Sequence, residues 1–476
     1  MPQASDAVVL FGATGDLCHR KIYPALYHLV RHGRLHCPVV GVARAGWRRE
    51  QLIERVRDSV AHFVSEPEEA VTERLASLLQ YVDGDYTQHS TFVSLRAALG
   101  SAAHPLHYLA IPPSVFPVVV TMLGESGCGR GARVVVEKPF GRDLPSALAL
   151  NQTLHQVFDE SAIFRIDHYL GKEPVQNLLY FRFANSMFEP IWNRNYVASV
   201  QITMAEKIGL AGRGRFYEEA GAIRDVVQNH LLQIVAFLAM EPPVRYAHDA
   251  LRDEKVKVFR AIRPLDPAHV VRGQFAGYRS EPGVAAQSHV ETFAAVKLAI
   301  DSWRWGGVPF YIRAGKCLPV TATEVVVDLK QPPVEVFGEM RGAQPNYLRL
   351  RLGPDVAIAL GMYTKQPGPL MRGREVELFV ARREQADEMD AYERLIADAI
   401  NGDAVLFARQ DEVEAAWAVV DPVLGGNTEL YEYPKGTWGP QEAERLLAGS
   451  LCSWHNPGND AQSWTRACGE RTGGPG

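Results

Sequence analysis

The sequence predicts an α/β protein in two parts: an N-terminal Rossmann-like, doubly wound parallel sheet, and a larger C-terminal α+β domain with a mainly antiparallel sheet. In the first third of the chain, short apolar runs alternate with helical patterns, which is typical of βαβ units. After about residue 165 the apolar residues instead recur with a period of two, which favours antiparallel strands. The 476 residues are 47% hydrophobic and 22% charged, which excludes a disordered chain.

The strands expected in the N-terminal part are short apolar runs bounded by glycine or polar residues. They lie at residues 7–11, 38–43, 81–82, 107–111 and 133–137. Ile22, Leu26 and Leu29 recur at helical spacing, and the pattern between residues 47 and 79 is mostly helical. Strands and helices therefore alternate as a parallel sheet requires.

The second part begins with an alternating segment. Val200, Ile202, Met204 and Glu206 alternate with more polar neighbours, which predicts a strand with one apolar and one polar face. Further strands are expected at 291–300, 308–312, 324–329, 347–352 and 356–360, and helices at 220–240 and 390–400. We expect a dinucleotide-binding domain over 1–166, a substrate and dimerisation domain over 167–450, and a flexible tail over 451–476.

Charge and cysteine usage narrow the function classes. A formal net charge of −5 argues against a protein that coats nucleic acid. The six cysteines are scattered without metal-ligand spacing, which predicts a reduced, cytoplasmic protein without a metal site. No signal peptide is evident, and the most apolar run, 231–240, is too short to cross a membrane.

A glycine turn follows the first expected strand. Glycines allow close backbone approach, and a helix N-terminus offers amide donors, so strand, turn and helix together suit a pyrophosphate. The turn departs from GxGxxG because Leu10 stands where the first glycine would fall, so an ordinary strand-to-helix turn is the alternative. The predicted coenzyme-binding residues of this turn are Gly12, Ala13, Thr14, Gly15, Asp16 and Leu17.

Arg44 ends the second expected strand, where such folds meet the adenosine ribose. A carboxylate there favours NAD, whereas arginine accommodates a 2′-phosphate. Since no Asp or Glu stands at this strand end, the sequence predicts NADP as the coenzyme, with NAD possible. The alternative is that Arg44, Arg48 and Arg49 form a solvated start of a helix.

Residues 165–173, with the sequence RIDHYLGKE, are the most informative segment. His168 and Lys172 are four residues apart, so a helix beginning here would place both on one face. With the Tyr169 hydroxyl they could bind a phosphate dianion, although a polar helix cap would have the same composition.

These nine adjacent residues resemble the signature of glucose-6-phosphate dehydrogenases. Similar segments follow in the family's order at 12–17, 20–24, 137–141 (EKPFG), 220–230 and 308–316, so the resemblance spans nearly all of the chain. It implies oxidation of glucose 6-phosphate at C1 to 6-phosphogluconolactone, the first step of the oxidative pentose phosphate pathway, with hydride transfer to NADP or NAD. It also implies a homodimer or larger homo-oligomer.

The resemblance assigns His230 as general base and Asp167 as the group that holds its imidazole. An imidazole suits this task because its ordinary pKa, about 6.5, lies near neutral pH. A lone helical histidine is more often structural, but the match around His230 favours the base. The resemblance implies that the substrate is bound by His168, Tyr169, Lys172, Glu206, Asp225, Lys316 and Lys21. It places Lys21 and Lys138 near the nicotinamide, and Asp85 and Tyr86 along the coenzyme.

Glu206 is also a candidate from pattern alone, because it shares the apolar face of its strand and an unpaired inward carboxylate is costly. The alternative is a strand-end residue turned to solvent. Four departures from the family pattern are Thr321 in place of a second lysine, Cys317 in place of arginine, Glu219 in place of a small hydroxyl residue, and Cys18-His19 in the nucleotide loop. We expect activity to survive them and either substrate affinity or sugar preference to differ.

Two other functions are compatible with parts of this pattern. A glucose–fructose oxidoreductase type of enzyme also carries an EKP turn, but its neutral sugar would not require the His168 and Lys172 pair. A non-catalytic sensor of sugar phosphate would keep the phosphate-binding residues and lose the base, whereas His230 and Asp167 are both present.

Overall fold

A computed structural model describes residues 3–334, 336–337, 345–381, 389–450, 453–459 and 464–466. The chain forms two compact units that interleave along the sequence. The first unit comprises Met1–Gln176, Pro243–Val256 and Asp387–Trp417. The second comprises Asn177–Pro242, Lys257–Ala386 and Ala418–Gly476. The predicted boundaries at 166 and 450 remain a prediction.

The first unit is built on a six-stranded parallel sheet with the order β3-β2-β1-β4-β5-β6. Its strands are β1 (Ala7–Phe11), β2 (Val39–Ala43), β3 (Leu79–Asp83), β4 (Pro105–Leu109), β5 (Arg133–Glu137) and β6 (Ile163–Ile166). The residues of β1, β2 and β4 are buried throughout, as expected for a parallel sheet covered on both faces. The predicted Rossmann-like doubly wound sheet is confirmed.

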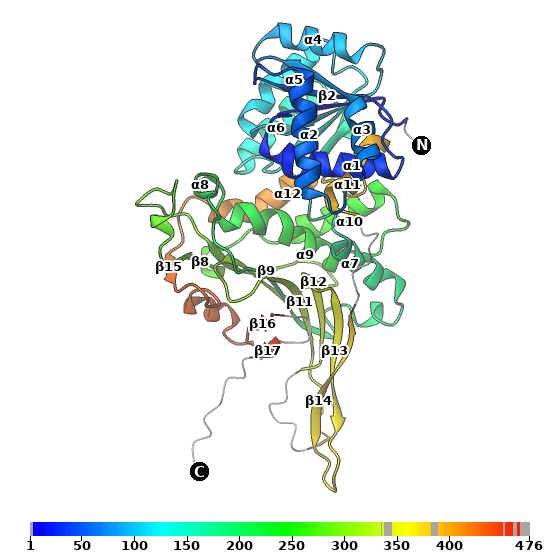
Figure 1. The fold of residues 1–476 in the computed structure, drawn as a ribbon. Helices are drawn as coiled ribbons and strands as arrows, with labels where there is room; N and C mark the ends of the chain where they lie inside the picture. The colour runs from blue at the N-terminus through cyan, green and yellow to red at the C-terminus, as the bar shows by residue number, and fades with distance from the viewer. Residues whose placement is uncertain are drawn as a thin grey trace. The chain divides into compact units, whose positions relative to one another are not determined.

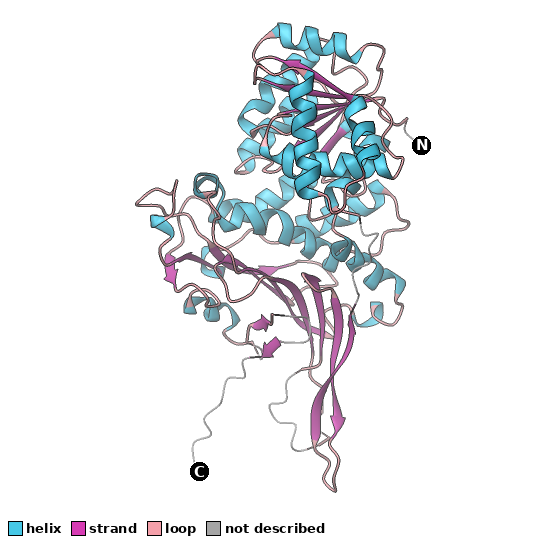
Figure 2. Ribbon diagram, viewed as in Figure 1, coloured by secondary structure: helices cyan, strands magenta, loops and turns pink. Residues whose placement is uncertain are grey.

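Helices cover both faces of this sheet (Figure 2). They are α1 (Tyr23–Arg31), α2 (Arg49–Phe63), α3 (Glu69–Leu78), α4 (His89–Leu99), α5 (Phe116–Glu125), α6 (Leu144–His155) and α11 (Ala391–Asn401). Three further helices lie partly in each unit: α7 (Glu173–Ala184), α10 (His248–Ala261) and α12 (Gln410–Val420). The order of the strands reverses between β1 and β4, and the carboxyl ends of strands at such a switch point form the usual ligand-binding edge.

The second unit contains a nine-stranded sheet with the order β14-β13-β12-β11-β7-β10-β9-β8-β15. Its strands are β7 (Val197–Glu206), β8 (Val270–Phe275), β9 (Phe293–Ala299), β10 (Pro309–Lys316), β11 (Ala322–Leu329), β12 (Tyr347–Gly353), β13 (Ala357–Lys365), β14 (Gly373–Ala381) and β15 (Leu430–Tyr433). Only the β7–β10 and β8–β15 pairs of this sheet are parallel, so the predicted mainly antiparallel sheet is confirmed.

Helices α8 (Gly214–Ala222) and α9 (Leu232–Ala239) lie along one face of this sheet (Figure 1). A nine-residue π-helix, η5 (Ile223–Leu231), joins them and packs on β9 and β10. The continuous helix predicted over 220–240 is therefore wrong in detail. Gly221 interrupts it with φ +67° and ψ 173°, a conformation that glycine alone adopts readily.

Strand β7 has the apolar and polar faces that its alternation predicts, and its polar face is also buried. Gln201 and Thr203 are both buried. The Gln201 side-chain amide donates to the Ser453 carbonyl at 3.0 Å, and the Arg313 guanidinium donates to the Thr203 hydroxyl at 3.0 Å. The alternation thus indicates a strand with two buried faces, one of them hydrogen-bonded.

Within the expected flexible tail, the side chains of Trp454 and His455 are buried, and strands β16 (His455–Pro457) and β17 (Trp464–Arg466) pair. Residues 451–452, 460–463 and 467–476 of that tail lie outside the described part of the chain. Among the helices that the structure describes, none combines the length and hydrophobicity that a bilayer crossing requires.

Candidate active site

The glycine turn lies at the carboxyl end of β1, in the first unit. Gly12 has φ +80°, and a Cβ there would lie 2.2 Å from the Ala110 carbonyl oxygen, so only glycine fits. The Gly15 N–H donates to the Gly12 carbonyl at 2.8 Å and closes the turn. A short π-helix, η1 (Cys18–Ile22), and α1 follow. Residues 12–17 therefore have the strand–turn–helix form that suits a pyrophosphate.

Tyr86 supports this turn from the neighbouring strands. Its hydroxyl accepts the Gly12 N–H at 2.9 Å and donates to the Val42 carbonyl at 3.1 Å. Burial raises the pKa of Tyr86 to about 12, so the hydroxyl stays protonated and can act as donor and acceptor at once. Tyr86 thus holds the backbone of the predicted coenzyme site.

Arg44 and Asp85 lie together at the carboxyl ends of β2 and β3. The Arg44 Nη1 atom lies 2.6 Å from Asp85 Oδ2, and 76% of the arginine side chain is exposed. Arg49 is different, because its guanidinium donates to the carbonyls of Leu79 at 2.6 Å and Ala76 at 3.1 Å. Of these arginines, Arg49 therefore has a structural role, and Arg44 keeps most of its surface accessible for an anion.

The EKP turn follows strand β5, and its Lys138–Pro139 peptide bond is cis. Glu137 accepts a hydrogen bond from the Tyr108 hydroxyl at 2.5 Å and another from the Tyr392 hydroxyl. Burial is the main cause that raises the pKa of Glu137 to about 7. Lys138 thus follows a partly buried carboxyl group that two tyrosines hold in place. Lys21, in contrast, lies exposed in η1.

The segment after strand β6 is a turn and not the helix that the spacing predicts. The N–H groups of Leu170 and Lys172 donate to the carbonyls three residues earlier, at 3.0 and 3.2 Å, and α7 begins only at Glu173. The buried Asp167 carboxylate accepts the Tyr169 N–H at 3.0 Å. Such a local bond between a side chain and the main chain favours a turn over a helix. The prediction of one helical face for His168 and Lys172 is therefore wrong.

The turn nevertheless groups the three predicted phosphate-binding residues. The Lys172 ammonium lies 4.4 Å from the centre of the Tyr169 ring, a cation–π contact. The His168 ring neighbours that of Tyr169, with centroids 6.5 Å apart, and stacks on Tyr392 with centroids 6.1 Å apart. Two basic groups and a phenol therefore occupy one turn.

Helix α11 packs directly against this turn. A Cβ at Gly171 would lie 2.8 Å from the Ala391 carbonyl oxygen, so the helix and the turn are in backbone contact. The Arg394 guanidinium pairs with the Glu173 carboxylate and donates to the Gln176 side chain at 2.8 Å. Arg394 thus holds the first turn of α7, directly after Lys172.

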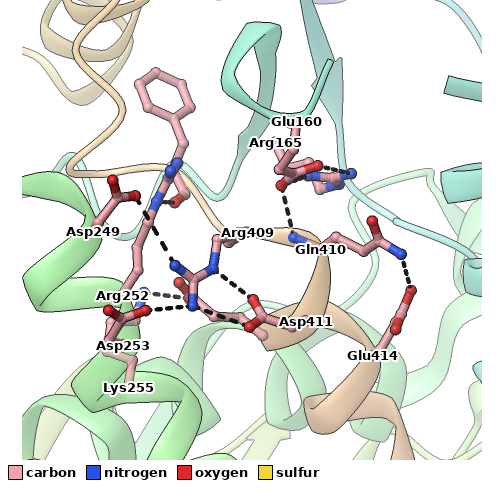
Figure 3. A network of polar contacts seen from close by, with 12 residues as sticks. Glu160, Arg165, Asp249, Arg252, Asp253, Lys255, Arg409, Gln410, Asp411 and Glu414 are labelled. Carbon is pink, nitrogen blue, oxygen red and sulfur yellow. Dashed lines mark hydrogen bonds and ion pairs between the residues drawn. The ribbon is translucent and has the colours of Figure 1, made fainter. Parts of the chain in front are cut away.

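Arg165, in the same signature, anchors the strand that leads into the turn. Its guanidinium is fully buried and donates to the Glu160 carboxylate at 2.7 Å and to the Asn151 side-chain Oδ1 at 2.9 Å. The same Glu160 oxygen accepts the main-chain N–H of Gln410, at the start of α12, at 2.9 Å (Figure 3). Arg165 therefore has a structural role, because its donors are directed to partners within the unit.

The network continues beside Gln410 (Figure 3). Arg409 pairs with Asp411 at 2.7 Å and with Asp253 of α10 at 2.7 Å. The Arg252 guanidinium donates to the Phe407 carbonyl at 3.0 Å. These contacts connect the chain before α12 to α10 within the first unit.

Glu206 and Lys316 form an ion pair in the second unit. They are register partners at the ends of the parallel strands β7 and β10. The Lys316 ammonium also lies 5.2 Å from the centre of the Tyr217 ring. Glu206 is 44% exposed and Lys316 only 7%, so the carboxylate faces partly to solvent while it neutralises a buried ammonium.

Asp225 and His230 lie on the π-helix η5 of the same unit. His230 is buried and Asp225 is half-buried. π-Helical segments occur frequently at functional sites, because the extra residue per turn redirects side chains. Asp167 belongs to the first unit and His230 to the second, so their predicted pairing remains a prediction.

Two of the four departures from the family pattern, Thr321 and Cys317, have distinct local structure. The Thr321 hydroxyl accepts the Lys207 N–H at 3.1 Å, so a short polar residue closes that turn. Cys317 has φ +54°, an uncommon conformation for a residue with a side chain, and follows Lys316 directly. Tyr217 and Tyr392 contact the candidate residues Lys316 and His168 and were not predicted, since no local motif contains them.

The first unit combines a doubly wound parallel sheet with a glycine turn and an accessible arginine. The second unit carries a histidine, two carboxylates and a lysine. These features are those of a nucleotide-dependent dehydrogenase. A family model described as "Glucose-6-phosphate dehydrogenase, NAD binding domain" matches residues 9–177, and "Glucose-6-phosphate dehydrogenase, C-terminal domain" matches residues 179–455. The chain therefore belongs to the glucose-6-phosphate dehydrogenase family, which confirms the resemblance.

Known relatives agree over nearly the whole chain. "Glucose-6-phosphate 1-dehydrogenase 1" of Mycobacterium tuberculosis is 44% identical and covers 95% of this chain and 97% of its own length. The crystal structure of glucose-6-phosphate 1-dehydrogenase from Mycobacterium avium is 43% identical, with a TM-score of 0.89 over 95% of this chain and 99% of its own. A glucose-6-phosphate dehydrogenase in complex with glucose 6-phosphate is 34% identical, with a TM-score of 0.87 over 95% of this chain and 100% of its own.

Proposed function

We propose that this chain oxidises the C1 hydroxyl of glucose 6-phosphate to 6-phosphogluconolactone and uses NADP as its preferred coenzyme. The observation that carries the proposal is the turn 167–172, which gathers His168, Tyr169 and Lys172 beside one another. A phosphate dianion needs such a set of cationic and hydroxyl donors, whereas a neutral sugar does not. The family membership and the relative solved with glucose 6-phosphate support the same substrate.

The proposed base is His230. Its imidazole would take the proton of the C1 hydroxyl while the C1 hydrogen leaves with its electron pair, so that a C=O bond forms at C1. The bound nicotinamide coenzyme supplies the hydride acceptor. Asp167 would hold the imidazole and stabilise its protonated form.

The remaining sugar contacts are proposed for four further residues. Glu206 and Asp225 accept hydrogen bonds from sugar hydroxyls, and Lys316 and Lys21 donate to the substrate. The Glu206–Lys316 ion pair fits this role, because the lysine holds the carboxylate in place before the substrate binds.

The coenzyme residues are proposed to lie at the carboxyl edge of the parallel sheet. The turn 12–17 would bind the pyrophosphate, and Asp85, Tyr86 and Lys138 would border the coenzyme. Arg44 would bind the 2′-phosphate that distinguishes NADP from NAD. The residues fit this group, because Gly12 leaves no room for a side chain and Arg44 is mostly exposed.

A spectrophotometric assay that crosses glucose 6-phosphate and glucose with NADP and NAD tests the proposal. We expect glucose 6-phosphate with NADP to give the highest kcat/KM. A preference for free glucose would contradict the phosphate site, and a preference for NAD would contradict the assignment of Arg44.

We also propose a homodimer or larger homo-oligomer formed through the second unit. Strand β14 is the outermost strand of its sheet and exposes Leu378 and Val380, and the β13–β14 hairpin extends beyond the other strands (Figure 2). Leu370 and Met371 at the hairpin are also exposed. Unpaired apolar strand edges favour association with another chain. Light scattering during size-exclusion chromatography would contradict this if it gave the mass of one chain.

A further inference from the structure

Glu291 supplies the hydrogen-bond acceptors for the start of the helix that carries Asp225 and His230. Its side-chain Oε1 accepts the Ile223 N–H at 3.1 Å, and its main-chain carbonyl accepts the Ala222 N–H at 3.0 Å. The first N–H groups of a helix have no partner within the helix and need acceptors from elsewhere. One residue from outside the helix therefore satisfies two of them.

Arg272 holds the Glu291 carboxylate in this position. The Arg272 Nε atom lies 3.2 Å from Glu291 Oε2, and each side chain is only 6% exposed. The guanidinium also donates to the carbonyls of Thr428, at 3.1 Å, and His289. The arginine is thus fixed by backbone on two sides, and the carboxylate is fixed by the arginine and the helix.

Gly221 makes room for this arrangement. A Cβ at residue 221 would lie 2.6 Å from Glu291 Oε1, inside any normal contact distance. The chain can therefore turn into the π-helix against the carboxylate only because residue 221 has no side chain. Asp225 follows Ile223 by two residues, and His230 lies about one π-helical turn further, so the direction of the helix start determines where both groups point.

We infer that Glu291, held by Arg272, is a positioning residue that directs the π-helix carrying the proposed substrate-binding Asp225 and the proposed base His230. This inference rests on the proposed function, since it concerns the geometry of that reaction. A carboxylate at a helix N-terminus is also favoured by the helix dipole, so the position combines hydrogen bonding with charge. Small displacements of a positioned base reduce turnover strongly.

Two double variants isolate the hydrogen bond from the charge. E291Q/R272M removes both charges and keeps a side-chain carbonyl that can accept the Ile223 N–H. E291L/R272M removes both charges and the acceptor. Removing both partners avoids the large penalty of leaving one buried charge alone.

For E291Q/R272M we expect kcat for glucose 6-phosphate oxidation within about threefold of the wild type. For E291L/R272M we expect kcat to fall about 30-fold or more and KM for glucose 6-phosphate to rise about fivefold, since general base catalysis depends on placement. The Kd of NADP, measured by fluorescence, should change less than about twofold in both, because the glycine turn and Arg44 belong to the other unit.

Equal kcat values for the two folded double variants would overturn the inference. If the Glu291–Arg272 pair only stabilised the fold, both variants would melt at a lower temperature but have the same kcat. If E291L/R272M does not fold, E291D is the second test: it keeps the charge for Arg272 but shortens the reach to Ile223, and we expect about a tenfold lower kcat. A wild-type kcat in E291D would also overturn the inference. Failure of the wild-type enzyme to oxidise glucose 6-phosphate would instead overturn the proposed function.

Discussion

The rings of His168 and Tyr392 stack with 10° between their planes and 6.1 Å between their centroids. Tyr392 lies in helix α11, far along the chain from the turn that holds His168. Its hydroxyl is hydrogen-bonded to Glu137, so the tyrosine connects the EKP turn to the proposed phosphate-binding turn. Both turns belong to the first unit, and one tyrosine side chain from α11 contacts both.

Replacement of Tyr392 tests this connection. We expect Tyr392→Leu to raise KM for glucose 6-phosphate about tenfold with a smaller loss in kcat, because His168 loses the surface that orients it. Tyr392→Phe keeps the stacked ring and loses only the hydroxyl, so its KM should lie between that of the wild type and that of Tyr392→Leu. Steady-state kinetics give both values, and a Tyr392→Leu enzyme with wild-type KM would show that the stack is not needed.

Lys172 is predicted to contribute through the substrate phosphate. Lys172→Gln should lower kcat/KM for glucose 6-phosphate about 100-fold and leave the slow oxidation of free glucose within about twofold, since only the phosphate needs the ammonium charge. The matched control is Lys365→Gln, because Lys365 is an exposed lysine in the second unit. Equal losses with both sugars would count against a phosphate contact.

Arg44 is predicted to discriminate between coenzymes. We expect Arg44→Ala to raise KM for NADP about tenfold or more and to change KM for NAD less than about twofold, because only NADP carries the 2′-phosphate. Arg57 pairs with Glu73 at 2.7 Å on the surface of the same unit, so Arg57→Ala is the matched control. A parallel rise in both KM values would show that Arg44 does not bind the 2′-phosphate.

The sequence predicts most accurately what is determined locally. Strands β1 and β5 have the predicted bounds 7–11 and 133–137, because each is an apolar run isolated between polar segments. Strand β14 was not predicted, since an edge strand with exposed residues lacks a continuous buried face.

In the candidate site, too, the sequence predicts only groupings of residues that are close together along the chain. The residues of turn 167–172 are adjacent in sequence, so a motif can group them. Tyr392 and Glu291 have no such motif, because packing of distant segments brings them to the turn and to the π-helix. The helix predicted from the spacing of His168 and Lys172 fails for a related reason: the Asp167 carboxylate and the close approach of α11 at Gly171 favour a turn.

His230→Asn should remove the proposed base while retaining a side chain of similar shape. We expect kcat to fall about 10³-fold or more, within the range that general base catalysis contributes, and the Kd of glucose 6-phosphate to change only a few-fold. Single-turnover kinetics and binding by calorimetry separate the two quantities. Turnover close to wild type would refute the assignment of His230.

Asp398, in helix α11, predicts a specific dependence of stability on pH. It lines a cavity of about 260 Å³ with Arg34 and Asp403. Burial, followed by the charge of Asp403, raises the pKa of Asp398 to about 7. Because an unfolded aspartate has a pKa of about 3.9, the folded state binds this proton more tightly. The protonated group stabilises the fold fully below about pH 4, and that stability is lost as the pH rises through 7.

Asp398→Asn keeps the shape of the side chain and removes its charge at every pH. The variant and the wild type should therefore have similar melting temperatures near pH 4.5, and the variant should melt several degrees higher at pH 8.5, where Asp398 of the wild type is ionised and this stability is lost. Scanning calorimetry at the two pH values measures this difference, and other titrating groups cancel in it. Asp355→Asn, at an exposed position, is the control and should show no such widening. A melting difference that is the same at both pH values would contradict the assigned ionisation of Asp398.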